Sequence, residues 1–437
     1  MKINRCLKIA VSLVIFFTVL FSVRTTLAQS VGKVELLNSQ NAVVNTFTTI
    51  QACANVIVAG QTCLVYPGTY AERVWILNKT GTEQQKITFK SATQQEAFVS
   101  SGFGLRTSKY IVIDGFKITS DLRGWDERQG IYVRSSDCDH LTLINNYIYD
   151  IKAGDAIEGG PYCIISNNTM YKVAAGIVAN TGCVVENNKV ERLYDWLMDG
   201  YYHVDNDYSR FFGDSVTFRG NYYYGTDRSE TGTSHVDCLQ TFDTNGTTGT
   251  NLLFENNICF VFSQAMMLEG TVLHQNQNYT IRNNIFAHGG AWGIRAKEIY
   301  NLNIYNNIFY DITYGAASLA DGSTGSVYNN IFHTIGAAST NTTDYNLFYN
   351  SGRLPSVVGT HDILDTDPLL ADVLNNNFNL LPGSPAIDAG KNLAGIVDTD
   401  INGNSRPRGS GWDIGAYEYA SPPDTTPPSA PTGLVVQ

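Results

Sequence analysis

Short runs of alternating hydrophobic and polar residues dominate the chain, and asparagines separate many of these runs. Alternation with a period of two predicts β-strands, and the runs are too short for ordinary helices. The phrase of strand, asparagine turn and apolar strand recurs with Asn145-Asn146, Asn167-Asn168, Asn187-Asn188, Asn221, Asn256-Asn257, Asn283-Asn284, Asn306-Asn307, Asn329-Asn330 and Asn346. Undisturbed steps are about 20–23 residues long, a period typical of a solenoid.

A coil of this length has room for three short strands and their turns. Each strand then pairs in parallel with its equivalent one coil further on, about 4.8 Å away. Asparagine tolerates the left-handed backbone of a tight turn, and stacked asparagines can form a hydrogen-bonded ladder inside the coil. Leucine-rich repeats have a similar period, but their leucine spacing and helical segments are missing here. The pattern therefore predicts an all-β, single-stranded parallel β-helix.

Three phrases precede the first full repeat: Ile50-Gln51-Ala52-Cys53, then Leu64 to Glu72 with the motif Pro67-Gly68-Thr69-Tyr70, then Tyr110 to Ile118. These phrases resemble the opening coils of the pectin-lyase-like superfamily of right-handed β-helix proteins. With the asparagine turns, the resemblance covers roughly residues 45–350 and implies a right-handed parallel β-helix of the secreted, bacterial type. That superfamily includes lyases, hydrolases, epimerases, esterases and adhesins, so the resemblance implies a fold and leaves the reaction open.

The chain is expected to have four segments. Residues 1–28 combine basic residues, an apolar run and small residues ending at Ala28, which predicts a cleaved signal peptide and a secreted or cell-surface protein without a membrane anchor. Residues 29–350 form the β-helix. Residues 351–420 resemble the C-terminal segment of secreted β-helices and are expected to cap the open end. Residues 421–437 are a proline-rich linker and the first strand of a truncated fibronectin type III-like module.

Composition excludes several functions. The chain has 437 residues and a net charge of −11, which argues against nucleic-acid binding. No phosphate loop, flavin or nicotinamide fingerprint, zinc-protease helix or GxSxG esterase motif occurs. We expect a monomer whose partner is an extracellular polysaccharide.

The cysteines predict one disulfide. Seven remain after loss of Cys6 with the signal peptide, and no CxxC motif suggests a zinc or redox site. Cys53 and Cys63 are expected to pair and close the N-terminal end. The other cysteines lie inside strand patterns, where a free cysteine usually behaves as a small buried apolar residue.

Two consecutive steps of the repeat each carry about a dozen extra residues, and such insertions emerge from a solenoid as loops, often on the binding face. The first holds Asp195, Trp196, Asp199, Tyr201, Tyr202, His203, Asp205, Asp207, Tyr208 and Arg210. The second holds Tyr222, Tyr223, Tyr224, Asp227, Arg228, Glu230 and His235. Aromatic rings beside carboxylates suit sugar recognition, because rings stack on pyranose faces while polar groups bind hydroxyls.

One strand of each coil can be aligned across the repeats. Its members begin at Gln129, Asp155, Ala175, Asp199, Asp237, Gln264 and Trp292. Alternation then predicts an outward column of Glu158, Tyr202, Gln240 and Arg295, a second column of Arg134, Asn180, Glu269 and Lys297, and Asp155, Asp199 and Asp237 at the preceding turn. Carboxylates stacked in this way should bind calcium or have raised pKa values.

The segment from Ser234 to Phe242 is the best single motif, because His235, Asp237 and Gln240 lie close together after an insertion. If the strand extends that far, alternation places His235 and Asp237 on one face. The predicted catalytic residues are His235, Asp237, Lys297, Arg295 and Arg210. The predicted substrate-binding residues are Gln240, Glu269, Tyr202, His203, Tyr223 and Trp292, and Asp199, Asp205 and Asp207 form a predicted calcium site.

Three functions remain open at this point. A lyase acting on a uronic-acid polymer needs a neutralised substrate carboxylate, a base for the C5 proton and an acid for the leaving oxygen. A glycoside hydrolase needs two carboxylates at a defined separation. A non-catalytic binding or adhesion module needs aromatic platforms alone. Basic residues and histidine gather on the predicted face of an otherwise acidic chain, which favours a lyase.

Overall fold

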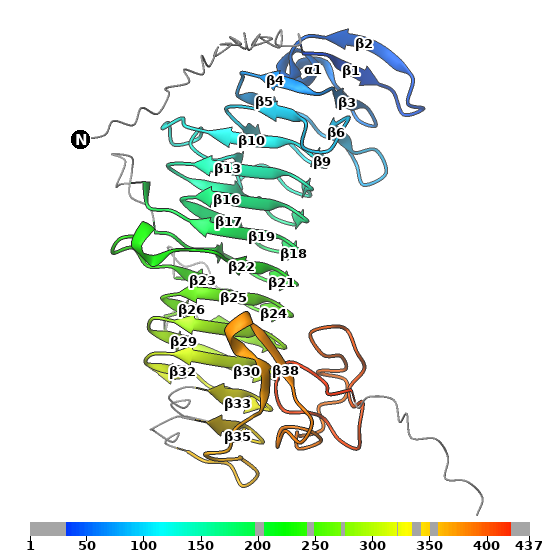
Figure 1. Cartoon of the computed structure of the whole chain (residues 1–437). Helices are drawn as coiled ribbons and strands as arrows, with labels where there is room; N and C mark the ends of the chain where they lie inside the picture. The colour runs from blue at the N-terminus through cyan, green and yellow to red at the C-terminus, as the bar shows by residue number, and fades with distance from the viewer. Residues whose placement is uncertain are drawn as a thin grey trace, which may run out of the picture.

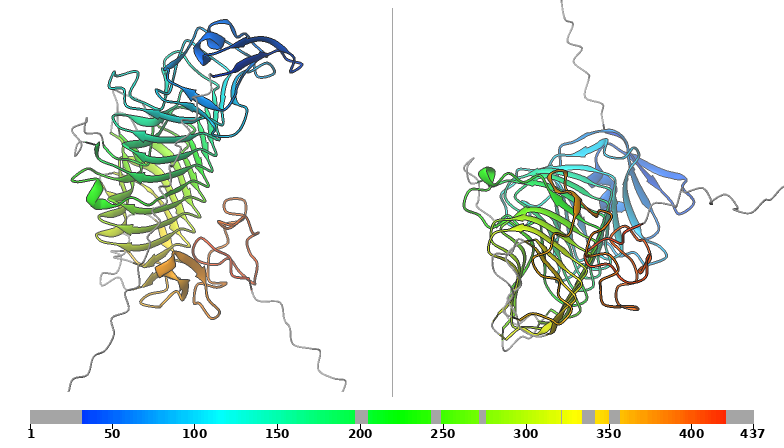
Figure 2. Two further views of the ribbon diagram at one scale, coloured as in Figure 1. Left: turned by 45° about the horizontal axis from the view of Figure 1, so that its top comes forward. Right: turned by 60° about the horizontal axis from the view of Figure 1, so that its bottom comes forward.

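The structure, a computed structural model, describes residues 32–196, 205–242, 249–271, 276–320, 322–333, 342–349 and 357–420. Over these residues the chain winds into a solenoid of stacked coils (Figure 1). Two further views show the length of the stack and the open outline of its coils (Figure 2). None of the helices in the described part of the chain is both long and apolar enough to cross a membrane. The predicted right-handed parallel β-helix is confirmed.

Three long sheets run along the solenoid, and each coil contributes one strand to each sheet. Sheet A has the order β2 (Val43–Phe47), β1 (Val34–Leu37), β3 (Thr62–Val65), β6 (Ile87–Ser91), β9 (Ile111–Asp114), β12 (Thr142–Ile144), β15 (Ile164–Ser166), β18 (Val184–Glu186), β21 (Thr217–Arg219), β24 (Leu253–Glu255), β27 (Asn276–Arg282), β30 (Ile299–Tyr305), β33 (Gly325–Tyr328) and β35 (Thr342–Asp344). Apart from β1 and β2, which are antiparallel to their neighbours, its strands pair in parallel.

Sheets B and C are parallel throughout their described strands. Sheet B runs through β4 (Gly68–Tyr70), β7 (Ala97–Val99), β10 (Lys117–Ser120), β13 (Tyr147–Ile151), β16 (Thr169–Val173), β19 (Lys189–Leu193), β22 (Tyr222–Tyr224), β25 (Ile258–Phe262), β28 (Ile285–Gly289), β31 (Ile308–Ile312), β34 (Ile331–His333) and β36 (Leu347–Tyr349). Sheet C runs through β5 (Val74–Leu77), β8 (Phe103–Arg106), β11 (Ile131–Val133), β14 (Asp155–Glu158), β17 (Ala175–Ala179), β20 (Ser209–Phe211), β23 (Asp237–Thr241), β26 (Gln264–Glu269), β29 (Trp292–Lys297) and β32 (Gly315–Ala320).

The asparagine turns connect sheet A to sheet B. The first residue of each turn adopts the left-handed backbone, as at Asn187 with φ of 55°. The second asparagine points inward and joins a continuous ladder. In that ladder the side-chain oxygen of Asn188 accepts hydrogen bonds of 3.0 Å from both the backbone and the side-chain nitrogen of Asn168. The ladder passes through Asn146, Asn168, Asn188, Asn221, Asn257, Asn284, Asn307, Asn330 and Asn346 and ends on Asp362.

The interior of the coils is filled by stacked apolar side chains. A row of phenylalanines runs from coil to coil with neighbouring ring centroids 5.0 to 6.1 Å apart: Phe254, Phe286, Phe309, Phe332 and Phe348. All five are fully buried. Equivalent positions of successive coils thus make the same contacts. Alternating apolar residues that recur in every coil are therefore enough to specify this core.

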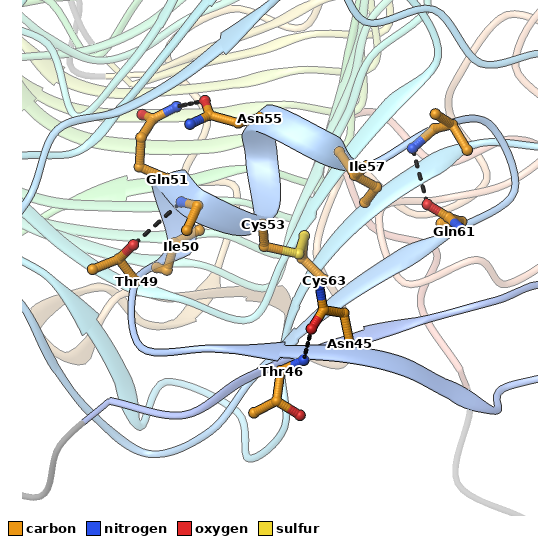
Figure 3. Close-up of a disulfide and its surroundings, with 12 residues drawn as sticks. Asn45, Thr46, Thr49, Ile50, Gln51, Cys53, Asn55, Ile57, Gln61 and Cys63 are labelled. Carbon is orange, nitrogen blue, oxygen red and sulfur yellow. Dashed lines mark hydrogen bonds between the residues drawn. A yellow bond between two sulfur atoms is a disulfide. The ribbon is translucent and has the colours of Figure 1, made fainter.

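The N-terminal end of the solenoid is covered by helix α1 (Ile50–Val56) and the antiparallel strands β1 and β2. Thr49 caps the helix by accepting a hydrogen bond from the backbone nitrogen of Ala52. The predicted disulfide between Cys53 and Cys63 is present and ties the helix to β3 (Figure 3). A second disulfide joins Cys238 to Cys259, which corrects the expectation that both are free.

The remaining free cysteines behave as predicted. Cys138, Cys163 and Cys183 are unpaired and buried. Because apolar surroundings disfavour a thiolate, burial raises the pKa of Cys138 to about 12.

Residues 357–420 begin at the last coil and then fold back along the outside of sheet B. Ile363 bridges to Leu347, so the segment first extends the stack. It continues through β37 (Leu370–Asp372), the short helix η3 (Val373–Asn375) and β38 (Asn377–Leu380). A second apolar core forms between this segment and the outer side of sheet B. Sheet B contributes Phe260, Ile285, Ala287, Ile308, Ile331 and Leu347, and the segment contributes Phe378, Leu380, Ala386, Ile414 and Ala416.

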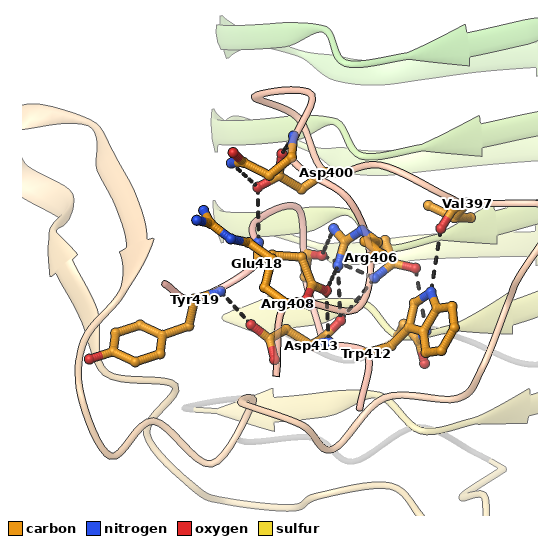
Figure 4. Close-up of polar contacts among 12 residues, drawn as sticks. Val397, Asp400, Arg406, Arg408, Trp412, Asp413, Glu418 and Tyr419 are labelled. Carbon is orange, nitrogen blue, oxygen red and sulfur yellow. Dashed lines mark hydrogen bonds and ion pairs between the residues drawn. The ribbon is translucent and has the colours of Figure 1, made fainter. Parts of the chain in front are cut away.

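Arg406 holds the folded-back segment to the solenoid (Figure 4). Its guanidinium lies 2.6 Å from the carboxylate of Glu418, and neither side chain is exposed. It also donates to the backbone oxygen of Gly415 at 2.8 Å and to the side-chain oxygen of Asn283 at 3.1 Å. Asn283 is the outward residue of an asparagine turn, so this turn supplies a docking point for the C-terminal segment.

Candidate functional site

The outer face of sheet C carries the polar column that the alignment predicts, with one change. In register, Glu158 pairs with Val178, Val178 with Arg210 and Arg210 with Gln240. The column continues through Met267 to Arg295. Arg210 therefore occupies the position that the sequence assigned to Tyr202, because the strand forms late in the insertion. Asp207, not Asp199, accordingly precedes this strand.

Three long connections border this face. Most segments that lead from a sheet B strand to the next sheet C strand are short, but residues 121–130, 194–208 and 225–236 are longer. The last of them contains the short helix η2 (Arg228–Glu230), which projects at the left edge in Figure 1. Each of the three segments directly precedes a strand of sheet C.

An open groove of about 570 Å³ lies on the sheet C face. Its lining residues come from four coils and from the segment after β26: Asp205, Gln240, Phe242, Glu269, Gly270, Thr271 and Lys297. Phe242 is partly exposed and contacts Phe212 edge to face at 5.2 Å. The groove thus combines an aromatic ring, an amide, carboxylates and an amine.

A buried ion pair lies beside the groove. The Nε atom of Arg210 donates to Asp207 at 2.6 Å, and an Nη atom donates to the backbone oxygen of Asp205 at 2.6 Å. The carboxylate of Asp205 lies 3.8 Å from the same guanidinium. Burial raises the pKa of Asp207 to about 7, although the charge of Arg210 opposes this shift.

Asp237 lies on the next coil and is fully buried. Its backbone nitrogen donates to Asp207 at 3.1 Å, and one carboxylate oxygen accepts from the backbone nitrogen of Gln264 at 3.0 Å. The other oxygen has no hydrogen-bond partner. Burial, followed by repulsion from Asp207, raises the pKa of Asp237 well above the ordinary range.

A second carboxyl pair lies further along the same face. Glu158 accepts a hydrogen bond of 3.0 Å from the side chain of Gln129. Burial, followed by the negative charge of Asp155, raises the pKa of Glu158 to about 8. Burial also raises the pKa of Asp155. The face therefore holds carboxyl groups whose pKa values are raised by burial.

Two cations lie at the far side of the groove. Arg295 and Lys297 are exposed and point outward from β29. Neither forms an ion pair with another residue in the described part of the chain, although Lys297 is the register partner of Glu269. Trp292 begins the same strand, and the centroid of its ring lies 6.3 Å from that of Tyr314. The predicted outward placement of Arg295, Lys297, Glu269 and Gln240 agrees with the structure.

Two predicted site residues differ from their expected placement on a strand. His235 is exposed, but β23 begins only at Asp237, so the strand does not bring His235 and Asp237 to one face. Tyr223 is fully buried and its hydroxyl lies 3.0 Å from that of Ser209, so it belongs to the interior of the coil instead of a substrate-binding surface. Its neighbours Tyr222 and Tyr224 stack on the outside of sheet B.

Some predictions cannot be compared with the structure. Asp199, Tyr202 and His203 lie outside the described residues. One carboxylate oxygen of Asp207 accepts a hydrogen bond from Arg210, and the other accepts one from the backbone of Asp237. The described residues include no cluster of three or more histidine, cysteine or acidic side chains suited to a metal ion. Calcium binding stays a prediction.

Sequence reasoning missed two polar groups of this face, Gln129 and Gln264. Both are buried, and each has a side-chain oxygen without a hydrogen-bond partner, as does the predicted residue Gln240. Gln129 and Gln264 stand at the leading positions of the aligned strands, so the alignment contained the signal. Phe242 follows β23 directly and is the last residue of the motif from Ser234 to Phe242.

Comparison with known proteins supports the fold. A profile of the right-handed beta helix region matches residues 74–238. The structure is similar to the crystal structure of pectate lyase Pel9A, with 18% identity, coverage of 87% of this chain and 93% of that chain, and a TM-score of 0.50. It is also similar to the complex structure of XylC with xylose, with 12% identity, coverage of 87% and 96%, and a TM-score of 0.51. A search of curated proteins finds no match.

Proposed function

We propose that the protein is secreted and cleaves a uronic-acid-containing extracellular polysaccharide by β-elimination in the sheet C groove. The observation that carries the proposal is the pair of cations without ion-pair partners among the described residues, Arg295 and Lys297, beside this groove in a chain of net charge −11. Such cations attract an acidic polymer to one face of an otherwise acidic molecule. The shared fold with a pectate lyase and with XylC, whose structure was solved in complex with xylose, supports carbohydrate as the substrate class.

The groove supplies the groups that β-elimination needs. Arg295 binds the carboxylate of the uronate, which makes the C5 proton more acidic. Lys297, two residues further along β29, first releases a proton to solvent, and its neutral amine then takes the C5 proton and becomes an ammonium again. The bond between C4 and the leaving oxygen then breaks, a C4–C5 double bond forms, and the leaving oxygen takes a proton from water in the open groove. Phe242 stacks on a pyranose face, and Gln240 binds hydroxyl groups.

Glycoside hydrolysis is the second candidate, favoured by a separate observation. Asp207 and Asp237 lie in register on adjacent coils, and the raised pKa values of both suit a general acid. A hydrolase of this kind would use one neutral and one ionised carboxyl. It would release reducing ends without forming a double bond, so its products differ from those of a lyase.

A screen of the secreted protein on uronic and neutral polysaccharides separates these functions. Absorbance of the unsaturated uronate and reducing ends are followed together, with calcium and with a chelator. New absorbance that falls by about 100-fold or more in Lys297→Ala supports the lyase. Lys189→Ala, which changes an exposed lysine on sheet B, is the matched control. Reducing ends without absorbance would favour the hydrolase, and polymer binding without products would favour a non-catalytic module.

A further inference from the structure

An exposed tryptophan stands beside sheet C at a distance from the groove. Trp125 lies in the long connection 121–130 and is 73% exposed. The guanidinium of Arg128 lies 4.0 Å from the centroid of its ring. One face of the indole therefore carries a stacked cation, and the ring remains largely open to solvent.

The connection that carries Trp125 is fixed to the solenoid. The mostly buried guanidinium of Arg73 donates to the backbone oxygens of Asp126 at 3.1 Å and Gln129 at 2.8 Å. Arg106 forms an ion pair with the carboxylate of Asp126. These contacts hold the connection at two points on either side of Arg128, so a ligand would meet a preorganised surface.

Arg128 forms no ion pair with any residue that the structure describes, and its buried Nε has no hydrogen-bond partner. The nearest acidic groups on which its charge acts are Asp155 and Glu158. The neighbouring Gln129 is 2% exposed, donates to Glu158 at 3.0 Å and leaves its own side-chain oxygen without a partner. An open ring, an unpaired cation and an unpaired amide oxygen thus occur together.

The position of this cluster connects it with the groove. It borders β11, and Gln240 of the groove lies on β23, four coils further along the same sheet. Four steps correspond to about 19 Å along the sheet. The outward column between them consists of Glu158, Val178 and Arg210, which gives a continuous track for an extended polymer.

We propose that Trp125 and Arg128 form a distal subsite for an anionic pyranose of the polymer that occupies the sheet C groove. The indole stacks on the apolar face of the sugar ring, and the guanidinium binds its carboxylate. The inference rests on the proposed function for the identity of the polymer. It adds a requirement for chain length, because a short oligosaccharide in the groove cannot reach the subsite.

Binding and cleavage by the full protein test this subsite, with polygalacturonate, alginate and their trisaccharides as probes. Trp125→Ala should weaken binding of the preferred polymer by about 5- to 10-fold and leave trisaccharide cleavage unchanged. Arg128→Gln should weaken polymer binding and reduce its salt dependence. Tyr162→Ala, which removes an exposed ring outside this face, is the control. Thermal unfolding of each variant confirms that it is folded.

The outcomes separate the subsite from the proposed function. Unchanged polymer affinity in both Trp125→Ala and Arg128→Gln would overturn the subsite even if the protein proves to be a lyase. Binding that needs Trp125 without any cleavage products would overturn the lyase and support the subsite. If neither acidic polymer binds to the unaltered protein, the subsite is overturned together with the proposed groove.

Discussion

At the scale of single residues, the two asparagines of each turn have different tasks. The first takes the left-handed backbone, a position that glycine fills at Gly220 with φ of 64°. The second supplies the internal ladder, where its side chain replaces the hydrogen bonds that water would give to the backbone. The sequence predicted both the turn and the ladder but not this division, because both residues are asparagine.

This division predicts that substitutions of the two asparagines in one turn change the stability of the protein by different amounts. Asn188→Ala removes the oxygen that binds Asn168 and leaves the backbone oxygen of Ile165 without its donor at 2.8 Å. Because these groups are buried, we expect a loss of about 2–4 kcal/mol in the free energy of unfolding. Asn187→Gly is the matched variant, and its exposed left-handed position should make it nearly neutral. Urea unfolding measures both, and equal losses would contradict the division.

Glu158 predicts a pH dependence of stability. Its pKa is raised from 4.5 to about 8, so the folded protein keeps a proton that the unfolded chain releases between these values. The Glu158 contribution therefore lowers the free energy of unfolding as pH rises through this window.

Glu158→Gln removes this titration and can keep the hydrogen bond from Gln129. We expect the variant to gain roughly 2 kcal/mol relative to the parent between about pH 5 and about pH 8. Thermal unfolding at both pH values measures the effect. An equally steep fall in parent and variant would show that Glu158 does not keep its proton.

The sequence assigned Tyr202 to the position in the outward column that Arg210 occupies, and this error has a physical reason. The insertion contains two phrases that begin with aspartate and continue into aromatic residues, at Asp199 and at Asp207. Either could precede a strand by alternation alone. Pairing with β17 and β23 selects the second, and such long-range pairing leaves no trace in the local pattern.

At the scale of elements, the C-terminal segment does more than cover the last coil. The side chains of Asn283, Asn306 and Asn329 bind its backbone at Thr399, Asp413 and Lys391 respectively. The sequence predicted the segment from its resemblance, whereas its path along sheet B depends on which asparagine of each turn faces outward. The apolar outer residues of sheet B, such as Ile285 and Ile308, are the signal that could have predicted that path.

Arg406 is predicted to be essential for this docking. Arg406→Met leaves the buried carboxylate of Glu418 without its ion pair and should destabilise the segment by about 3–5 kcal/mol. Hydrogen exchange should then rise in residues 396–420 while the N-terminal coils stay protected. Arg408→Ala changes an exposed neighbour and serves as the control. Unchanged exchange in Arg406→Met would contradict the predicted role.

The second disulfide could not be predicted from the sequence. Cys238 lies on β23 of sheet C and Cys259 on β25 of sheet B, so the bond crosses the interior of the solenoid. Each cysteine occupies an inward position that an apolar residue fills in other coils. Only the three-dimensional path shows that these two inward positions meet, whereas Cys53 and Cys63 were already close in sequence.

At the scale of the whole molecule, charge is distributed unevenly. The chain carries −11 overall, yet Arg128, Arg295 and Lys297 of the sheet C face have no ion pair with described residues. Binding of an acidic polymer should therefore weaken by about 10-fold or more between about 50 mM and about 500 mM salt. Calorimetric titration measures the affinity. An affinity that does not depend on salt would argue against recognition through these cations.

The fold was predictable because the same interactions recur in every coil. A short period, alternation and the asparagine turns each indicate parallel strands, and they agree along the chain. The candidate site was less predictable, because it depends on pairing between insertions of unequal length. The columns through Gln240, Arg295 and Lys297 were predicted, whereas His235 and Tyr223 were misplaced where the strand boundary and the direction of the side chain differed from simple alternation.

The constant asparagine corner has a consequence for how such a molecule can change. From β12 onward, every described connection from sheet A to sheet B has two residues, while connections from sheet B to sheet C vary widely. One corner therefore keeps the coils in register, and another accepts loops of different length without disturbing them. New specificity could be grafted onto this scaffold, by evolution or by design, through exchange of the segments that precede sheet C, with the ladder left untouched.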